Sequence, residues 1–94
     1  MDFQIRITQA ALDDFEDILS YAWEHFPATA ERFGNSILNH IGLLSSFPYI
    51  GQRVADRPGV RQIVHSPIAI YYTVHVSPNF VEIIRLRHTS RHSW

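Results

Sequence analysis

The sequence predicts an α+β domain in which a helical hairpin packs on one face of a curved, mainly antiparallel sheet of about four strands. Two patterns lead to this prediction. Apolar residues recur every three or four positions over 12–26 and again over 30–44, the spacing of amphipathic helices. They alternate with polar residues over 3–7 and over three later segments, the period of half-buried strands. The element order is β-α-α-β-β-β, and a chain of 94 residues is expected to form one domain, 1–94.

The first helix is expected to begin after Thr8, whose hydroxyl can cap it. Its apolar stripe consists of Leu12, Phe15, Leu19, Ala22, Trp23 and Phe26. Pro27 should end this helix, and Thr29 is expected to cap the next one. The second stripe consists of Ala30, Phe33, Ile37, Ile41 and Leu44. Because the join is short, the two helices should be antiparallel neighbours.

The second half is expected to form consecutive strands after a loop over 45–59, a stretch rich in turn residues. The strands should cover Val60 to His65, Ile68 to Val76, and Phe80 to about His88. Two connections between them, Ser66-Pro67 and Ser77-Pro78-Asn79, are short enough to be hairpin turns. This connectivity makes the sheet mainly antiparallel.

The composition excludes several classes of protein. The chain has no cysteine, which rules out disulfides and cysteine-ligated zinc. No apolar run approaches the ~20 residues that a membrane helix needs. The first residues, MDFQIRITQ, lack the basic and apolar regions of a secretion signal. We therefore expect a cytoplasmic protein with no membrane segment.

Charge is distributed unevenly although the net charge is only −1. Residues 1–47 contain seven acids and two arginines, a net −5, whereas residues 48–94 contain six arginines and two acids, a net +4. All basic side chains are arginines, which suit bidentate pairing with carboxylates or phosphates. The pattern predicts that the first helix presents its acids and that one basic surface forms from Arg61, Arg85, Arg87 and Arg91.

Short motifs follow one another in the second half: a Pro-x-x-Gly turn, a valine–arginine pair, a serine–proline hairpin before an aromatic strand, and a hydrophobic run ending in histidine. They are Pro48 to Gly51, Val60-Arg61, Ser66-Pro67 with Ile70-Tyr71-Tyr72, and 81–88, with Arg91 following. In this order they resemble the RelE/ParE toxin superfamily of type II toxin–antitoxin systems, and its ParE-like branch in particular. The chain departs from the family at Ile68-Ala69, where an aromatic–arginine pair is common, and at Arg87, where an apolar residue usually precedes the histidine.

The resemblance implies a toxin of the plasmid-stabilisation type that a cognate antitoxin neutralises, with a hetero-oligomer as the expected assembly. ParE-type members are described as poisons of DNA gyrase, and RelE-type members cleave mRNA in the ribosome. A weak net charge favours a protein target, because phosphate binding draws on many basic groups; direct nucleic-acid binding is not expected. Candidate target-binding residues are Arg53, Arg61, Tyr72, Arg85, Arg87, His88 and Arg91.

A ribonuclease needs a base, an acid and cations around one phosphate. RelE-type sites usually rely on lysines and a late tyrosine, whereas this chain has no lysine and no tyrosine after Tyr72. Strand alternation also places Arg85 and Arg87 on one face and His88 on the other. We therefore expect no catalytic residues, with a RelE-like ribosome-dependent mRNA endoribonuclease and an inactive antitoxin-binding relic as alternatives.

Metal and cofactor sites are also not expected. His88 and His92 have a spacing that suits chelation on a helix, but they lie in a strand and its tail. The first helical stripe is most simply core. Any part of it left exposed would suit an amphipathic antitoxin segment.

Overall fold

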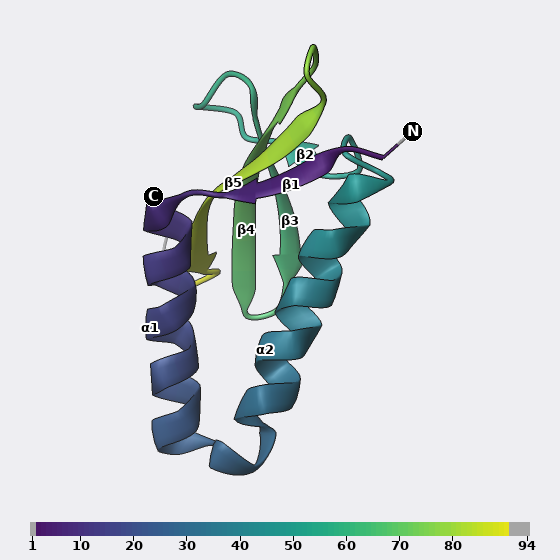
Figure 1. Ribbon diagram of the computed structural model, residues 1–94. Coiled ribbons are helices and arrows are strands. Elements are labelled where there is room, and N and C mark those ends of the chain that lie inside the picture. Colours follow the sequence, from purple (N-terminus) through teal and green to yellow (C-terminus); the bar gives the residue numbers. More distant parts are fainter. Residues whose placement is uncertain (1, 91–94) are drawn as a thin grey trace.

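A computed structural model describes residues 2–90. The chain runs through β1 (Gln4–Ile7), α1 (Gln9–His25), α2 (Pro27–Gly42), a 3-10 turn (Leu43–Ser45), β2 (Gln52–Arg53), β3 (Val60–His65), β4 (Ile68–His75) and β5 (Phe80–His88). The five strands form one sheet in the order β1-β5-β4-β3-β2 (Figure 1). β1 is parallel to β5, and the other neighbours are antiparallel. The predicted α+β fold is confirmed, with five strands rather than about four.

Local chemistry explains where the helices begin. The hydroxyl of Thr8 accepts a hydrogen bond from the Ala11 N–H at 3.1 Å, the predicted cap of α1. The expected cap of α2 at Thr29 is wrong, because this helix already begins at Pro27. Proline suits the first turn of a helix, where its missing N–H has no intrahelical partner to lose.

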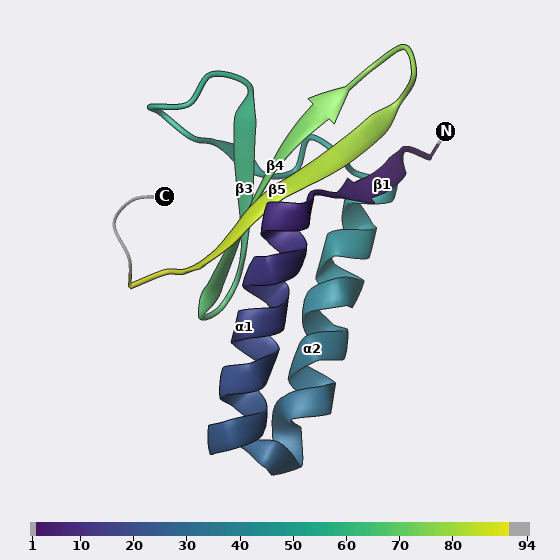
Figure 2. The ribbon, with the colours of Figure 1, turned by 60° about the vertical axis from the view of Figure 1, so that its left-hand side comes forward.

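The core lies between the two helices and one face of the sheet (Figure 2). Its fully buried side chains come from both layers and include Ile37, Leu44, Ile68, Ile70, Tyr72, Val81 and Ile83. Both helices continue past the turn between β3 and β4, so their joined ends have no sheet beside them (Figures 1 and 2). For this reason Trp23 is 52% exposed and Phe26 61% exposed, although the helical stripe predicts both as core.

The strands match their predicted ranges closely, apart from two features. β2 has only two residues and lies in the predicted loop, because so short a strand shows no alternation. β5 contains a β-bulge at Ile84: Tyr71 of β4 pairs with Arg85 and Tyr72 pairs with Ile83, so Ile84 has no partner in β4. The predicted hairpin connections at residues 66–67 and 77–79 are confirmed. Neither described helix is long and apolar enough to cross a membrane.

Candidate functional site

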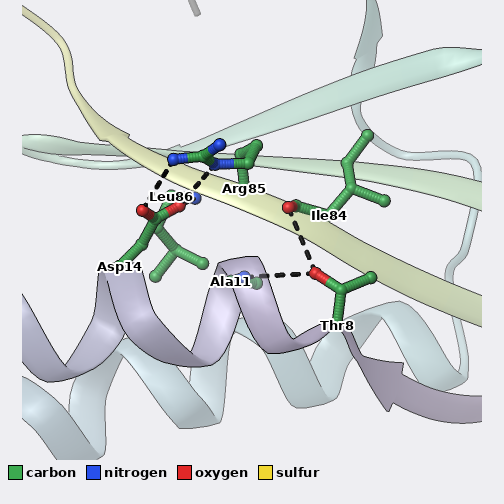
Figure 3. Close-up of polar contacts among 6 residues, drawn as sticks. All are labelled: Thr8, Ala11, Asp14, Ile84, Arg85 and Leu86. Carbon is green, nitrogen blue, oxygen red and sulfur yellow. Dashed lines mark hydrogen bonds and ion pairs between the residues drawn. The ribbon is translucent and has the colours of Figure 1, made fainter.

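The outer edge of β5 changes its partner partway along the strand. β1 pairs with β5 as far as Ile83, and the chain then turns into α1. Beyond that point Thr8 donates its hydroxyl hydrogen to the Ile84 carbonyl at 3.2 Å, and Asp14 accepts the Leu86 N–H at 3.0 Å (Figure 3). Side chains at and just after the start of α1 therefore satisfy backbone groups that a longer β1 would have paired.

Asp14 also binds Arg85, which comes from the far end of the chain (Figure 3). Arg85 donates from Nε to Oδ2 at 2.8 Å and from Nη2 to Oδ1 at 2.9 Å, a bidentate pair. The Arg85 and Asp14 side chains retain only 27% and 12% exposure, respectively. The hydrogen bonds to Asp14 raise the pKa of Arg85 above its ordinary value. Arg85 thus joins α1 to β5.

A second cluster fixes the loop before β2. The Gly51 N–H donates to the Tyr72 hydroxyl at 2.9 Å, and Arg61 Nη1 donates to the Gly51 carbonyl at 2.8 Å. A Cβ at position 51 would lie 2.6 Å from the Gln62 carbonyl oxygen and 2.6 Å from the Tyr72 hydroxyl, which explains the glycine. Burial raises the pKa of Tyr72, although the Gly51 hydrogen bond and Arg61 partly oppose that shift. Tyr72 is fully buried and therefore holds the fold rather than contacting a partner directly.

The remaining candidates are scattered. Arg53 is exposed and lies directly opposite Arg61 across β2 and β3. Arg87 is half-buried, and its Nε has no hydrogen-bond partner among the described residues. His88 is exposed at the end of β5, opposite Ile68. Arg91 lies outside the described residues, as does His92 of the spaced histidine pair.

The predicted single basic surface is therefore wrong for the arginines that the structure describes. Arg85 is bound to an acid of α1, and Arg61 lies opposite the buried Tyr72 in the β3–β4 pair and holds a loop. The expectation that α1 presents acids is met by three exposed side chains, Asp13, Glu16 and Asp17. No group of three or more potential metal ligands occurs within residues 2–90.

An apolar groove lies between the two helices near their joined ends. It has a volume of about 360 Å³, and its lining includes Ile18, Tyr21, Phe26, Ala30 and Phe33. Pro67 and His88 line its sheet side. Tyr21 and Phe26 are 55% and 61% exposed, so the helical pair presents uncovered apolar surface. Sequence analysis missed Tyr21, because this tyrosine lies outside the apolar stripe of the first helix.

Comparison with known proteins agrees with this architecture. The family model described as the ParE toxin of type II toxin–antitoxin system, parDE, matches residues 5–92. The chain is similar to a solved structure of the chromosomal ParDE system from P. aeruginosa, with a TM-score of 0.77 and 19% identity over 92% of this chain and 95% of that one. No curated protein sequence matches.

Two further solved structures share the fold. The toxin–antitoxin complex RelBE2 from Mycobacterium tuberculosis gives a TM-score of 0.72 and 20% identity over 94% of this chain and 99% of that one. The YoeB/ParE toxin from Agrobacterium tumefaciens gives a TM-score of 0.65 and 21% identity over 90% of this chain and 96% of that one. The fold and the family match together identify this chain as the toxin component of a type II toxin–antitoxin system. The chain belongs to the ParE toxin family.

Proposed function

We propose that this protein is a ParE-like toxin that arrests growth by binding a cytoplasmic protein target, with DNA gyrase as the candidate, and that a cognate antitoxin neutralises it. The observation that carries the proposal is the match of the ParE family model to residues 5–92. Maintenance of a plasmid or chromosomal element would then be its role. The antitoxin partner itself follows from membership of a toxin–antitoxin family.

The placement of the polar side chains supports binding over RNA cleavage. A phosphate clamp needs free guanidinium groups near a titratable group. The Arg85 guanidinium is already engaged by both carboxylate oxygens of Asp14. His88 follows Arg87 directly in β5, so regular pairing directs the two side chains to opposite faces.

Growth assays and purified components test the proposal. Expression without antitoxin should arrest growth with DNA damage and leave mRNA intact, and the purified protein should stall gyrase on cleaved DNA. Codon-phased cuts in ribosome-bound mRNA would instead establish the RelE-like ribonuclease. Absence of both effects, with antitoxin binding retained, would establish an inactive relic.

The variants for this assay should leave the fold intact. Arg61 and Arg85 hold structural contacts, so their replacement would mix loss of stability with loss of target binding. The exposed candidates Arg53 and His88 are better choices. Each alanine variant should weaken target association by about fivefold or less unless the residue is a desolvated hot spot.

The apolar groove is the proposed seat of an amphipathic antitoxin segment. Its aromatic rim, Tyr21 and Phe26, offers surface whose burial stabilises a complex. Tyr21→Ala should weaken antitoxin binding by about fivefold or more, since a buried aromatic anchor contributes over about 1 kcal/mol. Trp23→Ala is the matched control, because Trp23 is similarly exposed on the same helix but does not line the groove. Equal losses in calorimetric titration of both variants would contradict this placement.

A further inference from the structure

A second hollow is lined by residues of the loop between β2 and β3. Figure 1 shows this loop at the opposite end of the molecule from the joined helix ends. The volume of the hollow is about 590 Å³. Three arginines, Arg53, Arg57 and Arg61, line it, and Tyr49 and Val74 contribute apolar wall. We call this hollow the arginine pocket. None of its residues belongs to the apolar groove between the helices.

Backbone hydrogen bonds hold the loop that carries Arg57. Val54 N–H donates to the Val60 carbonyl at 2.9 Å, and Val60 N–H donates to the Arg57 carbonyl at 3.0 Å. Arg57 N–H in turn donates to the Val54 carbonyl at 3.2 Å. Gly59, at φ +81°, supplies the left-handed residue that closes this turn. The loop is therefore preorganised, which lowers the entropy lost on binding.

Two arginines of the arginine pocket are placed as close like charges. Arg53 and Arg61 lie directly opposite each other in the β2–β3 pair, an arrangement of like charges that disfavours pairing. Arg61 uses Nη1 for backbone carbonyls, and its guanidinium lies 5.2 Å from the Tyr49 ring centroid. No carboxylate lines the hollow among the residues that the structure describes; Asp56 is in the same loop but outside the lining. An anion placed here would relieve the repulsion.

We propose that the arginine pocket binds acidic side chains of a peptide segment of a protein partner. Guanidinium groups pair with carboxylates through two parallel hydrogen bonds, and the exposed Tyr49 ring, at 55%, offers a surface for an adjacent apolar side chain. A nucleic-acid strand presents a row of phosphates and needs a basic track to follow. The arginines Arg53, Arg57 and Arg61 form one cluster around a hollow rather than such a track, which favours the acidic side chains of a short peptide segment.

This inference deepens the proposed function by naming a surface for a protein partner, and it is tested separately from growth arrest. The probe is fluorescein-labelled decaglutamate, titrated at low ionic strength with fluorescence anisotropy as the readout. Fluorescein-labelled decauridylate of similar charge is the comparison. Arg53→Ala and Arg57→Ala remove pocket charges, and Arg6→Ala removes an exposed charge from β1, outside both the arginine pocket and the apolar groove.

Each pocket variant should weaken decaglutamate binding by about fivefold, and the double variant by more, while Arg6→Ala stays within about twofold of the unaltered protein. The urea midpoint of Arg53→Ala should stay unchanged, because this side chain is exposed; the midpoint of Arg57→Ala is measured alongside it. The proposal fails if decaglutamate does not bind, or if Arg6→Ala loses as much affinity. It also fails if decauridylate binds more tightly and depends on the same arginines. Peptide binding by a protein that arrests no growth would refute the proposed toxin activity and leave the pocket assignment standing.

Discussion

Replacing Asp14 with alanine removes three hydrogen bonds at once: two from Arg85 and one from the Leu86 N–H. Breaking a fully buried ion pair by removing one partner costs about 3–5 kcal/mol. Arg85 is 27% exposed, so water solvates part of the released charge and lowers that figure. The Leu86 N–H also loses a charged acceptor, a contribution of about 1.5–3 kcal/mol. We expect a net destabilisation of about 2–4 kcal/mol.

Urea denaturation followed by circular dichroism measures this loss of stability. In thermal denaturation, the Tm should fall by about 10 °C or more for a domain of this size. Asp13→Ala is the matched control, because this exposed neighbour carries the same charge and accepts an exposed hydrogen bond from Gln9. Its effect should stay within about 0.5 kcal/mol.

A double variant separates the ion pair from the backbone contact. Asp14→Leu with Arg85→Met replaces both charges with apolar side chains, and such replacements of ion pairs are often neutral. The double variant should be more stable than Asp14→Ala but weaker than the unaltered protein, because the Leu86 N–H still lacks its acceptor. A cost for Asp14→Ala as small as that of Asp13→Ala would refute the role assigned to this pair.

Three further predictions concern the loop before β2 and the contact between α2 and β3. Tyr72→Phe should destabilise the fold by about 1–2 kcal/mol, because the buried Gly51 N–H loses its acceptor; urea midpoints measure this. Gly51→Ala should be more damaging because its Cβ meets a backbone oxygen at 2.6 Å, whereas Gly42→Ala, with open space, should stabilise α2 by up to about 1 kcal/mol. Burial, and then neighbouring His65 with its Nδ1 at 3.0 Å, lower the pKa of His40. The folded protein then binds fewer protons than the unfolded chain, whose histidine titrates near ~6.5. The free energy of unfolding should therefore be at its maximum above pH ~6.5 and should decrease as the pH drops from there to the lowered pKa of folded His40. The decrease should be smaller in His40→Gln, and an equal decrease in that variant would contradict the assignment.

Local patterns in the sequence were sufficient for the order of the elements. Helices and buried strands differ in period, so the helical hairpin and the three later strands follow from side-chain spacing alone. Turn residues located the hairpins, and Thr8 located the start of α1. β2 was missed because two residues carry no period. The parallel pairing of β1 with β5 joins opposite ends of the chain, and alternation within either strand contains no information about its partner.

The sequence by itself also determined that arginines dominate the basic residues of the second half, but not what each one does. Arg85 pairs with Asp14 71 positions away. Arg53 lies beside Arg61 only because β2 pairs with β3, and Arg57 lines the same hollow. Likewise, the helical stripe marked Phe26 as core, and only the lengths of the packed layers decided that the stripe runs past the sheet and remains exposed. Periodicity reports which side of an element is apolar, whereas neutralisation of a charge and covering of a surface depend on neighbours that the chain brings together only on folding.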